Sequence, residues 1–155
     1  EKMVEGITTL DLAGSLNVTG DTALAATLYK KTLSAQTTNF SPTDADSGTV
    51  YGIAATGVTA SLPDANSNAG VHYTFIMLGT GLKTLLTASV GDSHFLGAIV
   101  GSTAGSAVHA NGTSHGQISS ESTVGGDTFT VMSTGIGNWV LINTNTHTPS
   151  HYTPG

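Results

Sequence analysis

The chain contains no cysteine and very little charge. The absence of Cys from its 155 residues excludes disulfide bridges, thiolate chemistry and zinc sites of the Cys type. Charged residues make up 9%, where an average soluble domain has about 25%, and a monomer normally carries a densely charged surface. With a mean hydropathy of +0.11, such a chain is expected to have much of its surface covered by other subunits.

Basic side chains are the scarcest charged groups. Four residues are Lys or Arg and the formal net charge is −6. Because nucleic-acid binding needs basic side chains that displace counterions from phosphates, no nucleic-acid partner is expected, and the same shortage argues against anionic membranes. The longest apolar stretch, 74–90, is interrupted by two glycines and Lys83, so no membrane-spanning segment is predicted. Neither end has the pattern of a signal peptide.

The chain has the length of one domain, and its patterns divide it into an N-terminal arm (1–48), a β module (49–143) and an extended polar tail (144–155). A six-residue repeat, 10–15 and 16–21, alternates apolar and polar residues before a Gly, which suits a short strand and a tight turn. Two repeats are fewer than the roughly three that a solenoid needs, so an ordinary hairpin is the alternative.

The remainder of the arm is less regular. The residues after Gly20 form either a weak third repeat or a short helix over Asp21–Lys31, with Asp21 as its N-cap. The polar stretch Thr32–Gly48, which contains Pro42, is predicted to be a linker or long loop.

Four residues of the arm are candidates for binding a partner. They form a row of apolar side chains at strand spacing: Leu10, Leu12, Leu16 and Val18. A segment this short cannot bury a core of its own. An unpaired strand edge of this kind is a template for adding to a neighbouring sheet, so we expect the arm to gain its structure by pairing with something else.

The β module shows short strands separated by Gly-rich turns, which indicate an all-β fold, an antiparallel sandwich or jelly-roll-like barrel. The strands are predicted at 58–62, 71–78, 82–88, 95–100, 128–132 and 138–143. The segment Ser102–Glu121, rich in Gly, Ser, Ala and His, is predicted to be a long exposed loop. Trp139, Phe75 and Tyr73 are expected to anchor the core, since a lone Trp at a strand start usually does so.

Three motifs suggest sites, and each has a plainer interpretation. One motif contains the three residue types of a hydrolytic triad in consecutive positions, Asp92-Ser93-His94. Strand neighbours point in alternating directions, however, and no Gly-x-Ser-x-Gly elbow is present. No catalytic residue is therefore predicted. His147 and His151 stand four apart with a proline between them, which argues against a helical metal site.

The acidic turn segments likewise predict no ligand. Asp44–Gly48 and Asp64–Asn68 resemble fragments of calcium loops but lack the required Gly and Glu, so both are interpreted as Asx turns. We predict no metal and no cofactor. The alternative is a metal site in a trimer, formed by one His from each chain near the three-fold axis.

Two stretches of the β module carry a resemblance. They are Ser61-Leu62-Pro63 followed by Asn68-Ala69-Gly70 and Tyr73-Thr74-Phe75-Ile76, and Gly126–Val131 followed by Asn138-Trp139-Val140-Leu141-Ile142. Together with the six-residue repeat, they resemble a β module of tailed-bacteriophage virion proteins, which occurs in fibres, tailspikes and head proteins.

The resemblance implies a non-enzymatic structural protein of a virion. A chain this short is most similar to a capsid decoration (cement) protein, a homotrimer on the capsid exterior that binds and stabilises the shell of major capsid protein. The apolar row of the arm would then dock on that shell or an adjacent subunit. The alternative is a tail-fibre or tailspike domain, which attaches to the tail or binds a host surface glycan. A sugar-degrading depolymerase would need paired carboxylates facing a cleft, and the sparse acids show no such pair.

Overall fold

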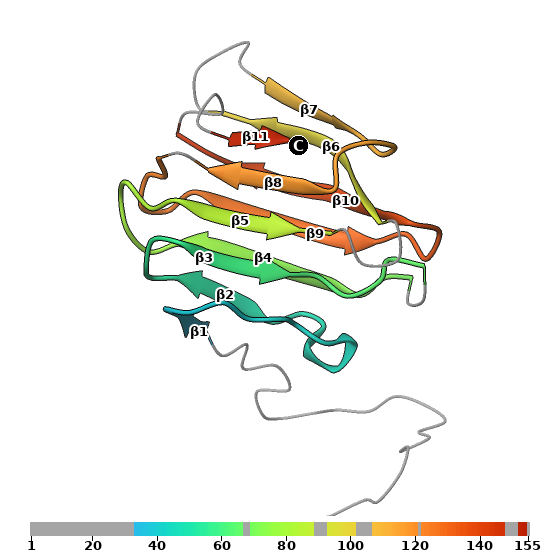
Figure 1. Ribbon diagram of the computed structural model, residues 1–155, viewed down its shortest axis with the longest axis horizontal. Coiled ribbons are helices and arrows are strands. Elements are labelled where there is room, and N and C mark those ends of the chain that lie inside the picture. The colour runs from blue at the N-terminus through green and yellow to red at the C-terminus, as the bar shows by residue number, and fades with distance from the viewer. Residues whose placement is uncertain are drawn as a thin grey trace, which may run out of the picture. The chain divides into compact units, whose positions relative to one another are not determined.

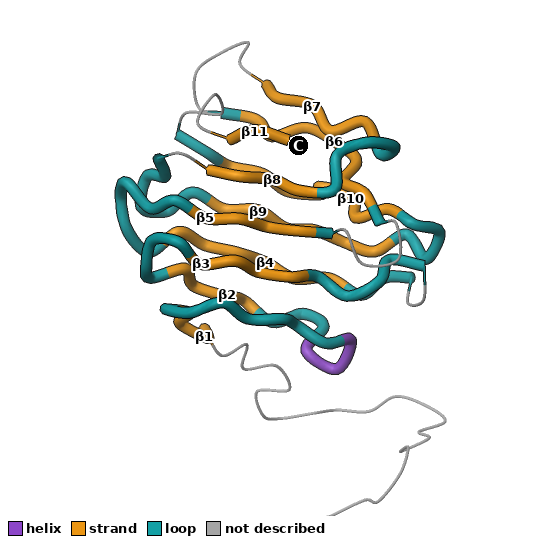
Figure 2. Tube along the Cα trace, in the orientation of Figure 1, coloured by secondary structure: helices purple, strands orange, loops and turns teal. Residues whose placement is uncertain are grey.

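The computed structural model describes residues 33–66, 69–88, 93–101, 107–120, 122–147 and 152–154. The chain divides into two units, Glu1–Lys30 and Lys31–Gly155, and all described residues belong to the second. This described part consists of eleven strands and one 3-10 turn, η1 (Asp44–Asp46) (Figure 2). The helix predicted over Asp21–Lys31 lies outside the described residues.

The strands form two sheets. The larger has the order β1 (Leu33–Gln36), β2 (Val50–Ile53), β4 (His72–Met77), β9 (Thr128–Ser133), β10 (Asn138–Asn145), β6 (His94–Val100) and β7 (Ala107–Asn111). The smaller has the order β11 (Tyr152–Pro154), β8 (Gln117–Ser120), β5 (Thr84–Thr87) and β3 (Val58–Ser61). Figure 1 shows the two sheets as layers, with β1 and β7 at opposite ends of the larger one. The predicted all-β sandwich is confirmed.

Strand pairing is mixed, because the chain changes sheet at each connection from β2 to β6. A strand that leaves a sheet, crosses the other layer and returns enters in its original direction, so β2 and β4 are parallel neighbours, as are β3 and β5. Two further pairs, β1–β2 and β10–β6, are also parallel. The antiparallel arrangement expected from the sequence holds for the remaining five described pairs.

Aromatic side chains fill the space between the layers. Trp139 and Tyr73 are 0% exposed and Phe75 is 2% exposed, so all three expected anchors lie in the core. The rings of Tyr73 and Trp139 are 5.6 Å apart, and those of Tyr51 and Phe75 are 5.8 Å apart. The Trp139 Nε1 donates to the Pro63 carbonyl at 3.2 Å, which gives the buried indole N–H the partner that it needs.

The sheets extend into segments that were predicted to be irregular. The expected linker Thr32–Gly48 contains β1, which pairs with β2, and η1. The expected polar tail contains β11, which pairs with β8 and carries the buried Tyr152. The extended tail was thus predicted without its pairing, and the linker without β1, for the same reason: main-chain pairing needs no apolar repeat, and one buried aromatic is enough to attach a three-residue strand.

The expected exposed loop Ser102–Glu121 holds two strands instead. β7 pairs with β6, and β8 pairs with β5. Each strand turns few apolar side chains inward, mainly Ala110 on β7 and Ile118 on β8. With so few inward apolar residues, these strands have nearly the composition of a loop, because small and hydroxylated residues occur in strands and in loops alike.

Trp139 provides a test of the core. Replacing it with Ala removes a fully buried ring and is expected to cost about 3–5 kcal/mol of unfolding free energy and to reduce soluble yield. Trp139→Phe, which keeps a ring but loses the bond to Pro63, should cost less. The matched control is Ile136→Ala, because Ile136 is 79% exposed. Urea unfolding followed by circular dichroism measures all three, and a wild-type midpoint for Trp139→Ala would contradict a core role.

Candidate interaction surface

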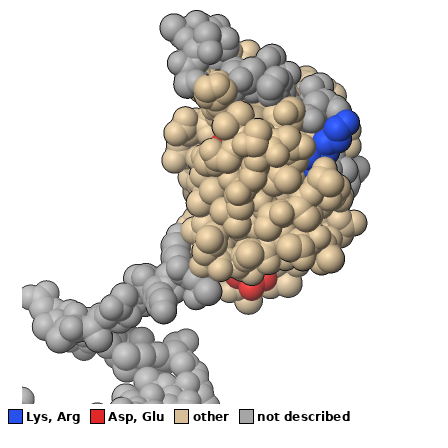
Figure 3. All heavy atoms as spheres, turned by 90° about the vertical axis from the view of Figure 1, so that its left-hand side faces the viewer, with Lys and Arg blue, Asp and Glu red and all other residues tan. Residues whose placement is uncertain are grey.

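None of the described strands carries a charged residue. The charged side chains of the described part all stand in turns and connections: Asp44, Asp46, Asp64, Lys83 and Asp127. The side of the module seen in Figure 3 is accordingly almost all uncharged, with few red or blue atoms. Sheet faces exposed to water usually carry charged and polar side chains, so this distribution sets the module apart from an ordinary monomeric sandwich.

The outer face of the seven-stranded sheet has two apolar patches, one near each end. The β1 patch consists of Leu33 on β1 and Leu78 after β4, which are 49% and 46% exposed. The β6 patch consists of Leu96 and Val100 on β6, with Ile142 at the bulge of the neighbouring β10; they are 39%, 49% and 49% exposed. Exposed apolar patches of this kind mark interaction sites more often than chance.

Two hydroxyl groups lie near the middle of the same face. Thr74 on β4 and Thr130 on β9 are cross-strand partners, and their Oγ1 atoms lie 3.0 Å apart. This pair separates the two patches along the strand order. The register also places Ile76, Met132 and Val140 on this face, so the part between the patches is mixed apolar and polar and contains no Asp, Glu, Lys or Arg.

A glycine in β2 shapes the β1 patch. A Cβ added at Gly52 would lie 2.6 Å from Leu78 Cδ1 and 3.2 Å from Leu33 Cδ1. Contacts below 3.0 Å are not found in real proteins, so any larger residue would push Leu78 away. Because position 52 has no side chain, the two leucines can lie over it and form a continuous apolar surface.

The outer face of the four-stranded sheet has a different chemistry. The register places hydroxyl and amide side chains there: Thr59, Ser61, Thr87, Gln117 and Ser119. These groups bind water well, whereas the two patches on the opposite layer do not. The two layers therefore differ in the surface that they offer to a partner.

The edges of the two sheets also differ. At the β3 edge, the Asn39 side chain accepts from Thr59 N at 2.8 Å, and Phe40 exchanges main-chain bonds with Thr59 and Ser61. At the other edge of that sheet, β11 ends in Pro154, and proline is one of the means by which proteins blunt an edge. In the described part no strand is hydrogen-bonded beyond β1 or β7, and neither strand contains a proline or a charge, but β11 of the smaller sheet contacts β7.

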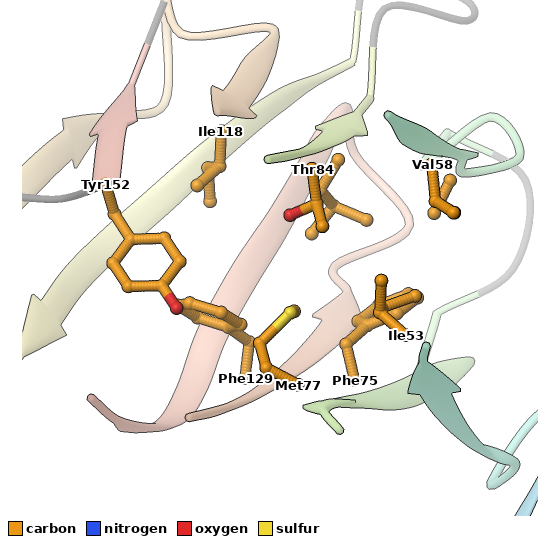
Figure 4. Close-up of a pocket in the computed structure, with 10 residues that line it drawn as sticks. Ile53, Val58, Phe75, Met77, Thr84, Ile118, Phe129 and Tyr152 are labelled. Atoms are coloured by element: carbon orange, nitrogen blue, oxygen red, sulfur yellow. The ribbon is translucent and has the colours of Figure 1, made fainter. Parts of the chain in front are cut away.

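A small cavity lies between the layers (Figure 4). Its volume is about 20 Å³, and its lining is apolar apart from Thr84 and Tyr152, whose hydroxyl groups bond to Ser120 and Asp127. Pockets for small molecules have volumes of about 300–1,000 Å³. This cavity is therefore a packing defect that has the size of a water molecule but offers it few partners.

The residues of the triad-like motif do not form a relay in the described part. Ser93 is 1% exposed, accepts from Ala65 N at 2.9 Å and donates to Asp64 Oδ1 at 3.2 Å. His94 is the next residue, on β6, and Asp92 lies outside the described residues. Asn66 N also donates to the Asp64 carboxylate at 2.9 Å, in the expected Asx turn. This backbone bond holds the pKa of Asp64 below its usual range.

The other predicted sites can be placed only in part. His147 is described and donates its backbone N–H to Asp127 at 2.7 Å, while His151 is not described. Within the described ranges, no three residues of the types His, Cys, Asp and Glu form a metal-binding group. The apolar row of the arm, Leu10, Leu12, Leu16 and Val18, lies outside the described residues.

Sequence reasoning missed a carboxylate that attaches the C-terminal strand. Asp127, 4% exposed, accepts from the Tyr152 hydroxyl at 2.6 Å and from Val124 N at 3.0 Å through Oδ2, while Oδ1 accepts from His147 N. Burial raises the pKa of the Tyr152 phenol far above 10, and the hydrogen bond to the Asp127 carboxylate raises it further. The only signal in the sequence is an isolated Tyr in a polar tail.

Tyr152→Phe tests this attachment. The variant loses a hydrogen bond to a charged acceptor, which typically contributes about 1.5–3 kcal/mol. Because the folded-state pKa of Tyr152 exceeds its unfolded value of 10.0, its contribution is complete below pH 10 and is lost as the pH rises further. Urea unfolding at pH 8 and pH 11 should show a smaller alkaline loss for Tyr152→Phe than for the wild type. An identical loss would contradict the argument.

No helix in the described part of the chain is both long and apolar enough to cross a membrane. Comparison of the chain with models of known protein families finds no match, and a search of curated proteins finds none either.

Proposed function

We propose that the protein is a non-enzymatic structural protein of a phage virion, a homotrimeric decoration protein that binds and stabilises the shell of major capsid protein. The observation that carries this proposal is the outer face of the seven-stranded sheet, which has no charged residue and two exposed apolar patches. The resemblance of Leu62-Pro63 and Trp139 with their flanking residues to virion modules supplies the biological setting.

The chemistry of the described surface favours assembly over catalysis. Catalytic sites bring titratable groups with perturbed pKa values together in a cleft. Here the buried hydroxyl of Ser93 is engaged with Asp64, the buried carboxylate of Asp127 is engaged with Tyr152, and the described cavity is of water size. These groups stabilise loops and the C-terminal strand, which is a structural role.

The arm and the module would have different roles in the proposed assembly. In this proposal the arm docks on the capsid through its apolar row, and the module joins copies to one another. Seven of the fourteen charged residues of the chain stand within residues 1–31. Contacts that depend on charge are therefore concentrated in the arm, while the strands of the module offer uncharged contacts.

The homotrimer is the first testable element. Multi-angle light scattering of the purified protein at micromolar concentration should give about three times the chain mass of 15.6 kDa, because a trimer covers the apolar patches. Adding Val100→Lys, which places a charge in the β6 patch, should shift the mass toward that of the monomer. Thr59→Lys, on the outer face of the other sheet, is the matched control and should remain trimeric. A wild-type monomer in solution would contradict the homotrimer.

The capsid role is tested by removing the arm. Deletion of residues 1–21 takes away the apolar row and should leave a folded trimeric module that no longer binds undecorated capsids. Co-sedimentation with capsids measures binding, and circular dichroism checks the fold. Wild-type affinity after the deletion would place the capsid contact in the module instead. In purified virions, a gel-band intensity comparable to that of the major capsid protein distinguishes decoration from the alternative of a tail appendage, which is present in few copies.

A further inference from the structure

We propose that Asn111 is a site of deamidation whose rate the fold controls, and that the reaction places a negative charge beside the β6 patch. The site lies where β7 (Ala107–Asn111) ends and the loop 112–116 begins. The chemistry of the site is independent of the proposed function. Its effect on association rests on the homotrimer of that proposal.

The residue after Asn111 is the one that favours this reaction most. The dipeptide Asn-Gly occurs once in the chain, and every other Asn is followed by a larger residue. Because Gly112 has no Cβ, nothing on that residue hinders attack by its own backbone nitrogen on the preceding side chain. Asn111 is exposed, so water and hydroxide ions reach it.

The reaction consumes only water. The Gly112 nitrogen gives its proton to a hydroxide ion or a water molecule and bonds to Cγ of Asn111. The bond between Cγ and Nδ2 then breaks, and ammonia leaves a succinimide ring. Water adds to one of the two ring carbonyls and opens the ring to an aspartate or an isoaspartate. Either product carries a carboxylate, which is ionised at neutral pH.

The folded loop restrains the attacking nitrogen. Gly112 N donates to the Phe95 carbonyl at 2.8 Å, and Phe95 N donates to the His115 carbonyl at 2.7 Å. The loop is thus attached to β6 through both main-chain groups of one residue, whose side chain is fully buried. Attack by the Gly112 nitrogen uses up its N–H and therefore breaks the first of these bonds.

The folded loop also restrains the amide that is attacked. Nδ2 of Asn111 donates to Ser114 Oγ at 2.9 Å. Oδ1 accepts from the backbone N–H groups of Thr113 and Ser114, both at 3.0 Å, in an Asx turn. Ring closure further requires Asn111 to leave the extended conformation in which it pairs with Leu96.

These bonds determine how much the fold slows the reaction. One net hydrogen bond shifts an equilibrium by about two- to ten-fold. Ring closure releases the bond of Gly112 N and those of the Asx turn, so the folded protein should react at least about ten-fold more slowly than the unfolded chain. Strand ends and loops open locally at low cost, so the folded protein still reacts.

The product changes the surface that the proposed function uses. Asn111 is the cross-strand partner of Leu96, which belongs to the β6 patch. A carboxylate at position 111 would be the first charged side chain on any described strand. If copies of the homotrimer meet through this patch, the contact has to desolvate an unpaired charge, which opposes association. Deamidation would therefore release or exclude the copies that have reacted.

Peptide mapping by mass spectrometry tests the site in the full-length protein. The wild type, Ser114→Ala and Thr113→Ala are incubated at about pH 8, with and without guanidinium chloride. In denaturant all three should react at the same rate, with position 111 the first Asn to convert. Without denaturant, Ser114→Ala should react about two- to ten-fold faster than the wild type, because it loses the bond to Nδ2. Thr113→Ala is the matched control and should react as the wild type, since its backbone N–H remains.

Three results would overturn the inference. Earlier conversion of another Asn in denaturant would show that the site lies elsewhere. Equal rates with and without denaturant would show that the fold does not control the reaction. A wild-type rate for folded Ser114→Ala, with its fold checked by circular dichroism, would show that the Asx turn does not restrain the amide.

The effect on association is measured separately by light scattering. Asn111→Asp keeps the side-chain oxygen that the turn needs and carries the charge of the product, so its mass should shift from trimer toward monomer. Gln117→Glu makes the same change of amide to carboxylate on the outer face of the other sheet and should remain trimeric. A fully trimeric Asn111→Asp protein would overturn the effect on association. A monomeric wild type would refute the homotrimer instead, and peptide mapping would still decide the site.

Discussion

The module depends on aromatic side chains whose rings meet between the two sheets and whose polar atoms hold the connecting loops. A buried phenol or indole must find a hydrogen-bond partner, and here each partner lies on a different connection. The Tyr73 hydroxyl donates to the Thr43 carbonyl at 2.7 Å, next to η1, and Trp139 Nε1 donates to Pro63 after β3. Tyr152 donates to Asp127, just before β9. Burial of the rings thus fixes both the spacing of the layers and the course of the chain between them.

This arrangement explains which elements could be predicted from the sequence. Strands that contribute several side chains to the core, such as β4 with Tyr73, Phe75 and Met77, show a clear alternation and were placed within a residue or two. β11 contributes only Tyr152, and β7 mainly Ala110, so their alternation is too weak to recognise. The parallel neighbours escaped prediction for another reason: the pattern within a strand records which face is buried but not which strand lies beside it.

The candidate surface was foreseeable in its chemistry but not in its position. The 9% content of charged residues predicted a surface poor in charge, and the described strands carry no charged residue. Only the register shows that Leu96 and Val100 point away from the core and that Gly52 allows Leu78 to lie over β2. The contrast between the covered β3 edge and the open β1 edge depends on Phe40 pairing with β3 across the layers, which no local pattern predicts.

The position of the charges is compatible with a net charge of −6 and the proposed assembly through a sheet. Like charges on a contact face oppose association directly, whereas exposed charges at a distance are screened over about 8 Å at physiological ionic strength. All charged residues of the described module stand in turns and connections, and seven of the fourteen in the whole chain stand within residues 1–31. The charged residues of the described module therefore stand outside the strands through which copies would meet in the proposed assembly. Contacts between strands would then depend on main-chain pairing and apolar burial, and the uncharged strands carry no charge that would oppose pairing with another chain.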